Sequence, residues 1–152
     1  LTLAFLGWTP DERLPDAVAA AAEAAAGVAP FALAFAGAAG RFPERGRPRV
    51  VWLGIGAGLE GVRRLGERVT GALRERAVRF DDRPLSAHLT LARVREDASL
   101  AEARTVAAAL EALAVPRLET EVREITVFES VLSPRGPRYT ARAHALLLPQ
   151  RE

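Results

Sequence analysis

The chain alternates between stretches with a helical hydrophobic period and stretches with the two-residue period of a strand, and this alternation limits its possible folds. In residues 59–77, leucine and valine recur at three- and four-residue spacing with charged residues between them, which predicts an amphipathic helix. Residues 118–130 and 139–148 alternate in the manner of strands. The turn-forming residues 133–137 lie between these two strands, so a hairpin is predicted there.

Capping and turn residues place the remaining elements. An alanine-rich helix is predicted over residues 14–26, with Gly27 and Pro30 as its stop signals. Another helix begins after Ser99, which has Glu102 three residues later as in a capping box. Strands are predicted over residues 1–6, 31–36, 49–54 and 86–95, and a turn-rich loop over residues 37–48. This order mixes hairpins with helical crossovers, so we expect an α+β fold rather than a doubly wound parallel sheet.

Length and composition fit a single domain. The chain has 152 residues, of which 49% are hydrophobic, and this is ample for a core. A formal net charge of only +2 gives weak overall attraction to nucleic acid, so any anionic partner must be held by local contacts. The absence of cysteine excludes disulfides, thiolate catalysis and cysteine-bound metals. No apolar run approaches the ~20 residues of a membrane span. We expect the protein to be cytoplasmic and monomeric.

One predicted strand, residues 86–95, carries a histidine and a threonine on the same face. Strand side chains alternate, so His88, Thr90 and Ala92 point one way while Arg93 points the other. Histidine exchanges a proton with a reacting oxygen near neutral pH, and threonine donates a hydrogen bond to an anion. The pair suits a phosphate, although a lone strand histidine is more often structural than catalytic.

A second stretch repeats part of this strand. Residues 1–4 and residues 89–92 both read Leu-Thr-Leu-Ala, and each stretch precedes a helix and then two strands. We interpret this as an internal duplication that gives two similar lobes facing each other across a groove. A histidine equivalent to His88 would fall just before Leu1. The sequence also lacks methionine, so we expect the natural chain to begin upstream.

Four blocks of the chain, in order, resemble the two-histidine (2H) phosphoesterases, specifically the LigT-like RNA 2′,3′-cyclic phosphodiesterases, which are also called 2′-5′ RNA ligases. Residues 88–93, His-Leu-Thr-Leu-Ala-Arg, are similar to the second His-x-Thr-x motif of that family. Residues 1–7 resemble the first motif after its histidine. Residues 42–43 with 48–52 resemble the segment between the motifs, and residues 130–139 resemble the closing hairpin.

The resemblance implies a bilobal fold with both motif strands lining a central groove, and no metal or organic cofactor. It implies hydrolysis of a 2′,3′-cyclic phosphate on RNA or a nucleotide to a 2′-phosphate, with a reverse 2′-5′ joining activity. His88 would be the acid that protonates the leaving 3′ oxygen, and Thr90 and Thr2 would hydrogen-bond the phosphate. Arg93 would stabilise its charge, which requires a bend or bulge because Arg93 lies opposite His88 on an ideal strand. The first catalytic histidine is expected just before Leu1.

Two other functions stay open from the sequence. A non-catalytic RNA- or nucleotide-binding module could have kept the groove and lost the first histidine. Within the 2H superfamily, the chain could also act on another nucleotide phosphodiester. His144 lies in an alternating strand with no chemical partner nearby in sequence, so we interpret it as a half-exposed structural residue.

Arginines and aromatic residues between the motifs each have two interpretations. The arginines of this loop either meet RNA phosphates or form a solvated loop balanced by Glu44; they are Arg41, Arg45, Arg47 and Arg49. Phe42 or Trp52 could stack on a base. For Trp52, which lies in an apolar strand, core packing is the favoured interpretation.

Overall fold

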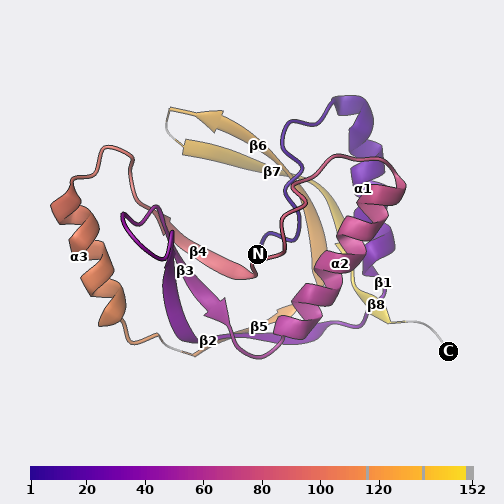
Figure 1. The fold of residues 1–152 in the computed structure, drawn as a ribbon. Helices are drawn as coiled ribbons and strands as arrows, with labels where there is room; N and C mark the ends of the chain where they lie inside the picture. Colours follow the sequence, from indigo (N-terminus) through magenta and orange to yellow (C-terminus); the bar gives the residue numbers. More distant parts are fainter. Residues whose placement is uncertain (116, 135, 150–152) are drawn as a thin grey trace. The chain divides into compact units, whose positions relative to one another are not determined.

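A computed structural model describes residues 1–115, 117–134 and 136–149 of the chain (Figure 1). The helices are η1 (Asp11–Arg13, a 3₁₀ turn), α1 (Leu14–Ala25), α2 (Leu59–Glu75) and α3 (Leu100–Glu111). The strands are β1 (Ala26–Gly27), β2 (Phe31–Phe42), β3 (Val50–Ile55), β4 (His88–Arg93), β5 (Leu118–Val122), β6 (Glu124–Ser133), β7 (Gly136–Leu146) and β8 (Leu148–Pro149). The elements form the predicted mixed α and β fold, in which β3 runs antiparallel to β2 and β4, and β6 runs antiparallel to β7.

The chain divides into two compact units. The first unit comprises Leu1–Thr2, Ala32–Glu60 and Ser86–Thr120. The second comprises Leu3–Phe31, Gly61–Leu85 and Glu121–Glu152. Each unit is therefore assembled from segments that are far apart in the sequence.

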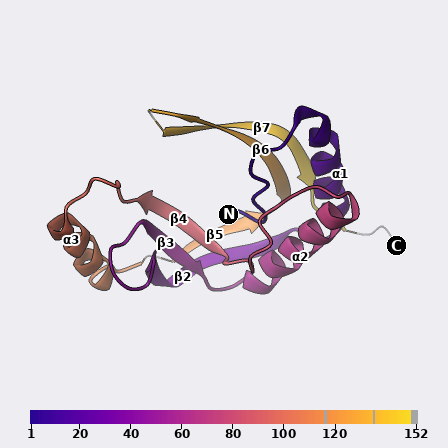
Figure 2. The same cartoon turned by 45° about the horizontal axis from the view of Figure 1, so that its top comes forward.

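A four-stranded sheet forms the first unit. Its strand order is β4-β3-β2-β5, and β3 runs antiparallel to both β2 and β4. Figure 2 shows β4, β3 and β2 side by side. Leu33 and Ala34 of β2 and Leu53 of β3 are buried, which is consistent with apolar side chains anchoring the sheet. The central position of β3 places β4 at the edge, where its side chains are largely exposed.

Helix α3 of the first unit begins with the capping box that the sequence predicts. The Ser99 hydroxyl accepts a hydrogen bond from the Glu102 backbone N–H, and the Glu102 carboxylate accepts one from the Ser99 backbone N–H at 2.6 Å. The Ser99 backbone N–H and the Ser99 hydroxyl both donate to the Glu102 carboxylate, and these two bonds lower the pKa of that carboxyl below its ordinary value. Two backbone donors that a helix leaves free at its start are thereby satisfied.

The core of the second unit is built largely from small side chains. Helix α1 contributes buried alanines, and α2 contributes its apolar stripe, in which Leu65 is only 2% exposed. Burial of a leucine of this kind contributes about 1.5–3 kcal/mol. The remaining core comes from the strand segments and the stretch after α2. Besides Leu65, the buried residues of this core as a whole include Ala20, Ala21, Ala24, Ala25, Val69, Ala72, Leu73, Val78, Ile125 and Leu147.

Arg68 of α2 satisfies the carbonyl groups at the end of α1. Its Nε donates to the Ala24 carbonyl at 2.7 Å, and one terminal nitrogen donates to the Ala26 carbonyl at 2.8 Å. Gly27 follows with a φ of +72°, a backbone conformation that favours glycine. The helix therefore ends where the sequence predicts, and an arginine from another helix holds its last carbonyls.

Strands β6 and β7 form the predicted hairpin of the second unit. The antiparallel pairing runs from Glu124 opposite Leu146 to Ser133 opposite Gly136, and Gly136 has a φ of +109°. Short strands β1 and β8 pair in parallel nearby in the same unit. Among the described residues, no helix is long and apolar enough to cross a membrane.

Three predictions about secondary structure are wrong. The stretch 118–130 is not one strand, because it is interrupted at residue 123 and its two parts join different sheets, β5 the four-stranded sheet and β6 the hairpin. Residues 1–6 do not form a strand. The Phe5 carbonyl accepts a hydrogen bond from the Asp81 N–H at 2.8 Å, while Leu3, Ala4 and Leu6 pack against the core. The hydrophobic alternation of residues 1–6 therefore reflects packing of their side chains against the core, and not hydrogen-bonded pairing with another strand.

Another wrong prediction concerns the loop at residues 37–48. Strand β2 continues to Phe42, because its last residues pair with β3 from Ala39 opposite Leu53 to Phe42 opposite Val50. The connection between the two strands is therefore only residues 43–49. The glycine and alanine residues at 38–40 favour a loop locally, but hydrogen-bonded pairing with β3 keeps this segment in a strand conformation.

Candidate active site

His88 is the first residue of β4, and a backbone carbonyl fixes the role of one ring nitrogen. Its Nδ1 lies 2.6 Å from the Ser86 carbonyl oxygen. A carbonyl only accepts hydrogen bonds, so Nδ1 carries a proton and donates it. The Nε2 atom is consequently the ring nitrogen that is left for chemistry on a ligand.

Thr90 and His88 share one face of the sheet, as predicted. His88 lies opposite Gly54 of β3, and Thr90 lies opposite Trp52. Residues directly opposite each other project from the same face. Thr90 is exposed, so its hydroxyl is available to a ligand that approaches this face.

A bulge in β4 brings Arg93 to the face that carries His88. Trp52 pairs with Thr90 while its neighbour Val51 pairs with Ala92, which leaves Leu91 as the extra residue on β4. Arg93 then lies opposite Val50, and Val50 projects from the same face as Trp52. The sequence alone placed Arg93 on the other face and required such a bulge for a role beside His88. The structure contains the bulge.

Two aromatic rings surround the imidazole of His88. The Phe42 ring meets it edge to face, with centroids 5.1 Å apart and planes at 77°. The Trp52 ring centroid lies 6.3 Å from that of His88, and the Phe42 and Trp52 centroids are 5.3 Å apart. Residues 42 and 52 were singled out as possible base-stacking positions, but their contact with His88 was not predicted.

This face therefore combines a proton-transfer group, a hydroxyl and a guanidinium beside a small aromatic cluster. A histidine with a free Nε2 can give or take a proton, and hydroxyl and guanidinium groups bind an anionic oxygen. These groups are the ones that a reacting phosphate ester needs.

Comparison with known proteins identifies the family. The family model described as the 2′-5′ RNA ligase superfamily matches residues 1–132. A relative from Thermus thermophilus, named RNA 2′,3′-cyclic phosphodiesterase, is 39% identical over 146 residues, which are 92% of this chain and 67% of the relative. The chain belongs to the 2′-5′ RNA ligase superfamily. The resemblance drawn from the two motifs is therefore confirmed.

Other relatives and solved structures agree with this family. An Archaeoglobus fulgidus protein of the same name is 34% identical over 140 residues, covering 91% of this chain and 74% of the relative. The crystal structure of TT0787 from Thermus thermophilus matches with a TM-score of 0.75 and 35% identity over 97% of this chain and 76% of that one. Escherichia coli LigT complexed with 3′-AMP matches with a TM-score of 0.69 and 27% identity, over 97% and 75% respectively. The predicted fold class is confirmed by these likenesses.

Thr2, the remaining predicted site residue of this superfamily member, lies outside the helices and strands. It is exposed and belongs to the first unit together with β4. The resemblance implies a motif strand at this position, and the structure does not have one. The bond from Thr2 to the phosphate stays a prediction.

Some of the arginines between the motifs stabilise the loop itself. Arg41 donates to the Gly46 carbonyl at 2.6 Å and to the Pro43 carbonyl at 3.3 Å. Arg47 donates to the Glu96 carbonyl at 2.8 Å. These two guanidinium groups thus hold the backbone on either side of the loop, a use that the sequence did not predict.

His144, the second histidine, has a different environment on β7. Its Nδ1 lies 2.9 Å from a carboxylate oxygen of Glu124, and its side chain is 55% exposed. Thr126 lies opposite His144 and donates to the same carboxylate at 2.9 Å. The bond with His144 lowers the pKa of the Glu124 carboxyl, and the Thr126 bond lowers it further. His144 is a half-exposed strand residue, as interpreted, although Glu124 is its partner.

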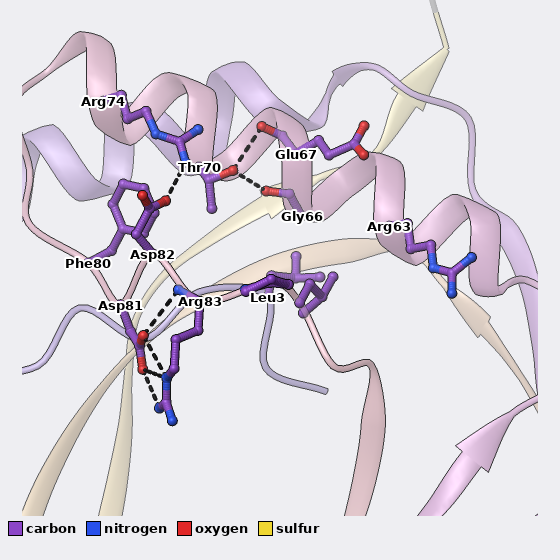
Figure 3. A pocket seen from close by; sticks show the side chains of 12 residues that line it. Leu3, Arg63, Gly66, Glu67, Thr70, Arg74, Phe80, Asp81, Asp82 and Arg83 are labelled. Atoms are coloured by element: carbon purple, nitrogen blue, oxygen red, sulfur yellow. Dashed lines mark hydrogen bonds and ion pairs between the residues drawn. The ribbon is translucent and has the colours of Figure 1, made fainter.

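A pocket of about 420 Å³ in the second unit is lined by α2 and the stretch up to Leu85 (Figure 3). Arg74 pairs with Asp82 there, and Arg83 pairs with Asp81, whose carboxyl pKa is lowered by that contact. The charges that line the pocket thus largely neutralise each other. Across the described ranges, no three histidine, aspartate or glutamate side chains are grouped to hold a metal ion.

Proposed function

We propose that this chain is the catalytic domain of an RNA 2′,3′-cyclic phosphodiesterase. The observation that carries the proposal is the single face of the β4-β3-β2 sheet from which His88, Thr90 and Arg93 all project, with Nδ1 of His88 bonded to the Ser86 carbonyl so that Nε2 is left for a ligand. Relatives at 34–39% identity that carry this name support it. The substrate would be a 2′,3′-cyclic phosphate at the end of an RNA or on a nucleotide, and the product a 2′-phosphate. Reverse 2′-5′ joining is part of the same proposal.

In the proposed hydrolysis, water attacks phosphorus and the bond from phosphorus to the 3′ oxygen breaks. His88 acts as the acid: in its doubly protonated form, Nδ1–H stays on the Ser86 carbonyl while Nε2–H is transferred to the leaving 3′ oxygen. The proton from water goes to a second histidine, which the resemblance places just before Leu1. Each proton transfer of this kind contributes about 10²–10⁴-fold in rate.

Three other side chains would stabilise the phosphate in this mechanism. Arg93 meets the charge that develops on the non-bridging oxygens, and Thr90 and Thr2 donate hydrogen bonds to them. Phosphoryl transfer needs mostly positioning and charge stabilisation from the protein, so this set is sufficient without a metal or an organic cofactor. We also propose that residues 1–152 act as one domain.

The test is an assay of the intact protein, including any residues that precede Leu1 in its gene. A dinucleotide ending in a 2′,3′-cyclic phosphate, incubated with the protein in EDTA, should give a 2′-phosphate at the same rate as with added Mg²⁺. His88→Ala should abolish product formation. Unchanged substrate with the wild-type protein, or product that persists with His88→Ala, contradicts the proposal.

Binding without catalysis is the alternative that this assay separates. A protein that holds a cyclic-phosphate oligonucleotide but never converts it would be a binding module that lost the first histidine. The catalytic relatives favour the enzyme.

We further propose that the enzyme works as a monomer in the cytoplasm, where its RNA substrate would be found. The motif residues described here all belong to one chain, so no second copy is needed to supply them. Size-exclusion chromatography with light scattering should give the mass of one copy. Cell fractionation should recover the protein in the cytoplasmic fraction.

A further inference from the structure

Glycine lies opposite each of the two rings that project from β3 and β4 onto the candidate active face. Gly40 of β2 pairs with Trp52, and Gly54 of β3 pairs with His88. A Cβ atom at Gly40 would lie 2.2–2.6 Å from Cζ2, Cη2 and Cε2 of the Trp52 indole. The indole therefore lies flat across the backbone of β2, at a distance that only glycine allows.

The position of Trp52 is not explained by its own hydrogen bonding. Its Nε1 is buried and has no hydrogen-bond partner within the described ranges. A buried donor without an acceptor is unfavourable. Contacts of the ring itself must therefore account for its place on this face, and they include the rings of Phe42 and His88 and the backbone at Gly40.

We propose that Trp52 is a positioning residue for His88, and that Gly40 is required because it leaves space for the indole. The proposal rests on the function proposed above. The Ser86 carbonyl determines which nitrogen of His88 carries the proton, while the rings of Trp52 and Phe42 restrict rotation of the imidazole. Together they hold Nε2 toward the ligand side of the sheet.

Rigid placement of the acid has a direct effect on rate. The leaving oxygen must meet Nε2–H in the transition state, and a misplacement of about 1 Å can cost ~10²-fold. Of the two β4 side chains proposed to bind the phosphate, Thr90 lies opposite Trp52, whereas Arg93 lies opposite Val50, beyond the bulge. Displacement of the indole should therefore lower kcat by more than it raises KM.

Gly40→Ala tests the proposal, with Gly71→Ala as its matched control. The methyl group at position 40 must displace the indole, whereas a Cβ at Gly71 meets no heavy atom within 4 Å. We expect Gly40→Ala to lower kcat by about 10–10²-fold, with a smaller change in KM. Gly71→Ala should have wild-type kinetics. Wild-type kcat for Gly40→Ala overturns the proposal.

Nitrogen NMR of the imidazoles provides a readout that does not depend on activity. The chain has two histidines, so His144 serves as an internal standard in the same spectrum. Neutral His88 should carry its proton on Nδ1 in the wild-type protein, and Gly40→Ala should shift it to a mixture of tautomers while His144 stays unchanged. Unaltered His88 signals in Gly40→Ala overturn the proposal even where kcat falls.

Trp52→Phe completes a double-mutant cycle and replaces Gly40→Ala where that variant does not fold. The substitution removes no hydrogen bond of Nε1, and the smaller ring frees the space above Gly40. Trp52→Phe should lower kcat and disturb the His88 tautomer, and adding Gly40→Ala should cause little further loss. Losses that multiply instead contradict the proposal. A wild-type protein without phosphodiesterase activity would contradict the proposed function alone, since the tautomer measurement tests positioning separately.

Discussion

The two histidines of this chain both lie on strands, but Nδ1 of one bonds to a neutral carbonyl and Nδ1 of the other bonds to a carboxylate. His88 donates from Nδ1 to the neutral Ser86 carbonyl and contacts two aromatic rings. His144 has the Glu124 carboxylate at Nδ1 and is 55% exposed. Each histidine has a threonine on its own face, Thr90 beside His88 and Thr126 opposite His144.

The difference shows that a histidine and threonine on one strand face do not by themselves define a reactive site. At His144, both the imidazole and the threonine hydroxyl bond to the same carboxylate, so the three groups satisfy one another. At His88, a backbone carbonyl occupies Nδ1, and Arg93 joins the face through a bulge. An anion is therefore attracted to the groups around His88 and not to those around His144.

The strongest test of this contrast is to remove each histidine in turn. His88→Gln should lower kcat by about 10²–10⁴-fold, because the proposed proton donor is lost. His144→Gln should leave kcat and its pH profile unchanged. Steady-state hydrolysis of a cyclic-phosphate dinucleotide measures both variants. Equal losses in the two would mean that the surroundings of the histidines do not decide their roles.

Arg93 gives the next largest effect. Arg93→Gln should lower kcat by about 10²–10³-fold, the usual cost of removing one group that stabilises developing charge. Arg49→Gln is the control, because Arg49 lies in the connection before β3, outside the register that pairs Val50 with Arg93. Its rate should stay within about threefold of wild type. A larger loss for Arg49→Gln than for Arg93→Gln would argue against the bulge as the device that places Arg93.

The two threonines allow a smaller comparison with an isosteric change. Thr90→Val should lower kcat/KM by about 10–10²-fold, since a hydrogen bond to a charged group contributes about 1.5–3 kcal/mol. Thr126→Val, which breaks a bond to Glu124 instead, should leave kcat/KM unchanged. Circular dichroism would check that both variants keep the fold. Similar kinetics for the two variants would remove Thr90 from the site.

The smallest expected effect concerns the pKa of Glu124, the partner of His144. The pKa of Glu124 is lowered in the folded chain, chiefly by its bond with His144. Its carboxylate therefore stabilises the fold above the ordinary value of 4.5, and this contribution is lost as pH falls through the lowered pKa. Carboxyl-carbon NMR should show Glu124 titrating below 4.5 in the wild-type protein and closer to 4.5 in His144→Gln. Because both side chains are exposed, the change in unfolding free energy should be small.

Local sequence patterns predicted those helices and strands that are specified by residues close together in the sequence. The amphipathic stripe predicted α2, Ser99 with Glu102 predicted the start of α3, and the turn between β6 and β7 predicted the hairpin. Each of these depends on spacing or on residues that are near in sequence. The strand pattern singled out His88 with Thr90, and the family resemblance then added Arg93 and Thr2 as site candidates.

Features that depend on distant partners were not predictable. The continuation of β2 through Gly40 and the position of the bulge at Leu91 are both set by pairing with β3. The contact of Phe42 and Trp52 with His88 requires three strands in register. A glycine at position 40 is the one local clue, and within a sequence it is indistinguishable from a turn residue.

The bond between His88 and Ser86 also affects how mutations can act on this protein. The acceptor is a main-chain oxygen, which every amino acid at position 86 would supply, so a coding change there leaves the atom in place. Glu124, by contrast, offers a side-chain oxygen that a single codon change removes. Sequence drift can therefore erase the partner of His144 in one step, while the partner of His88 is inherited with the backbone itself.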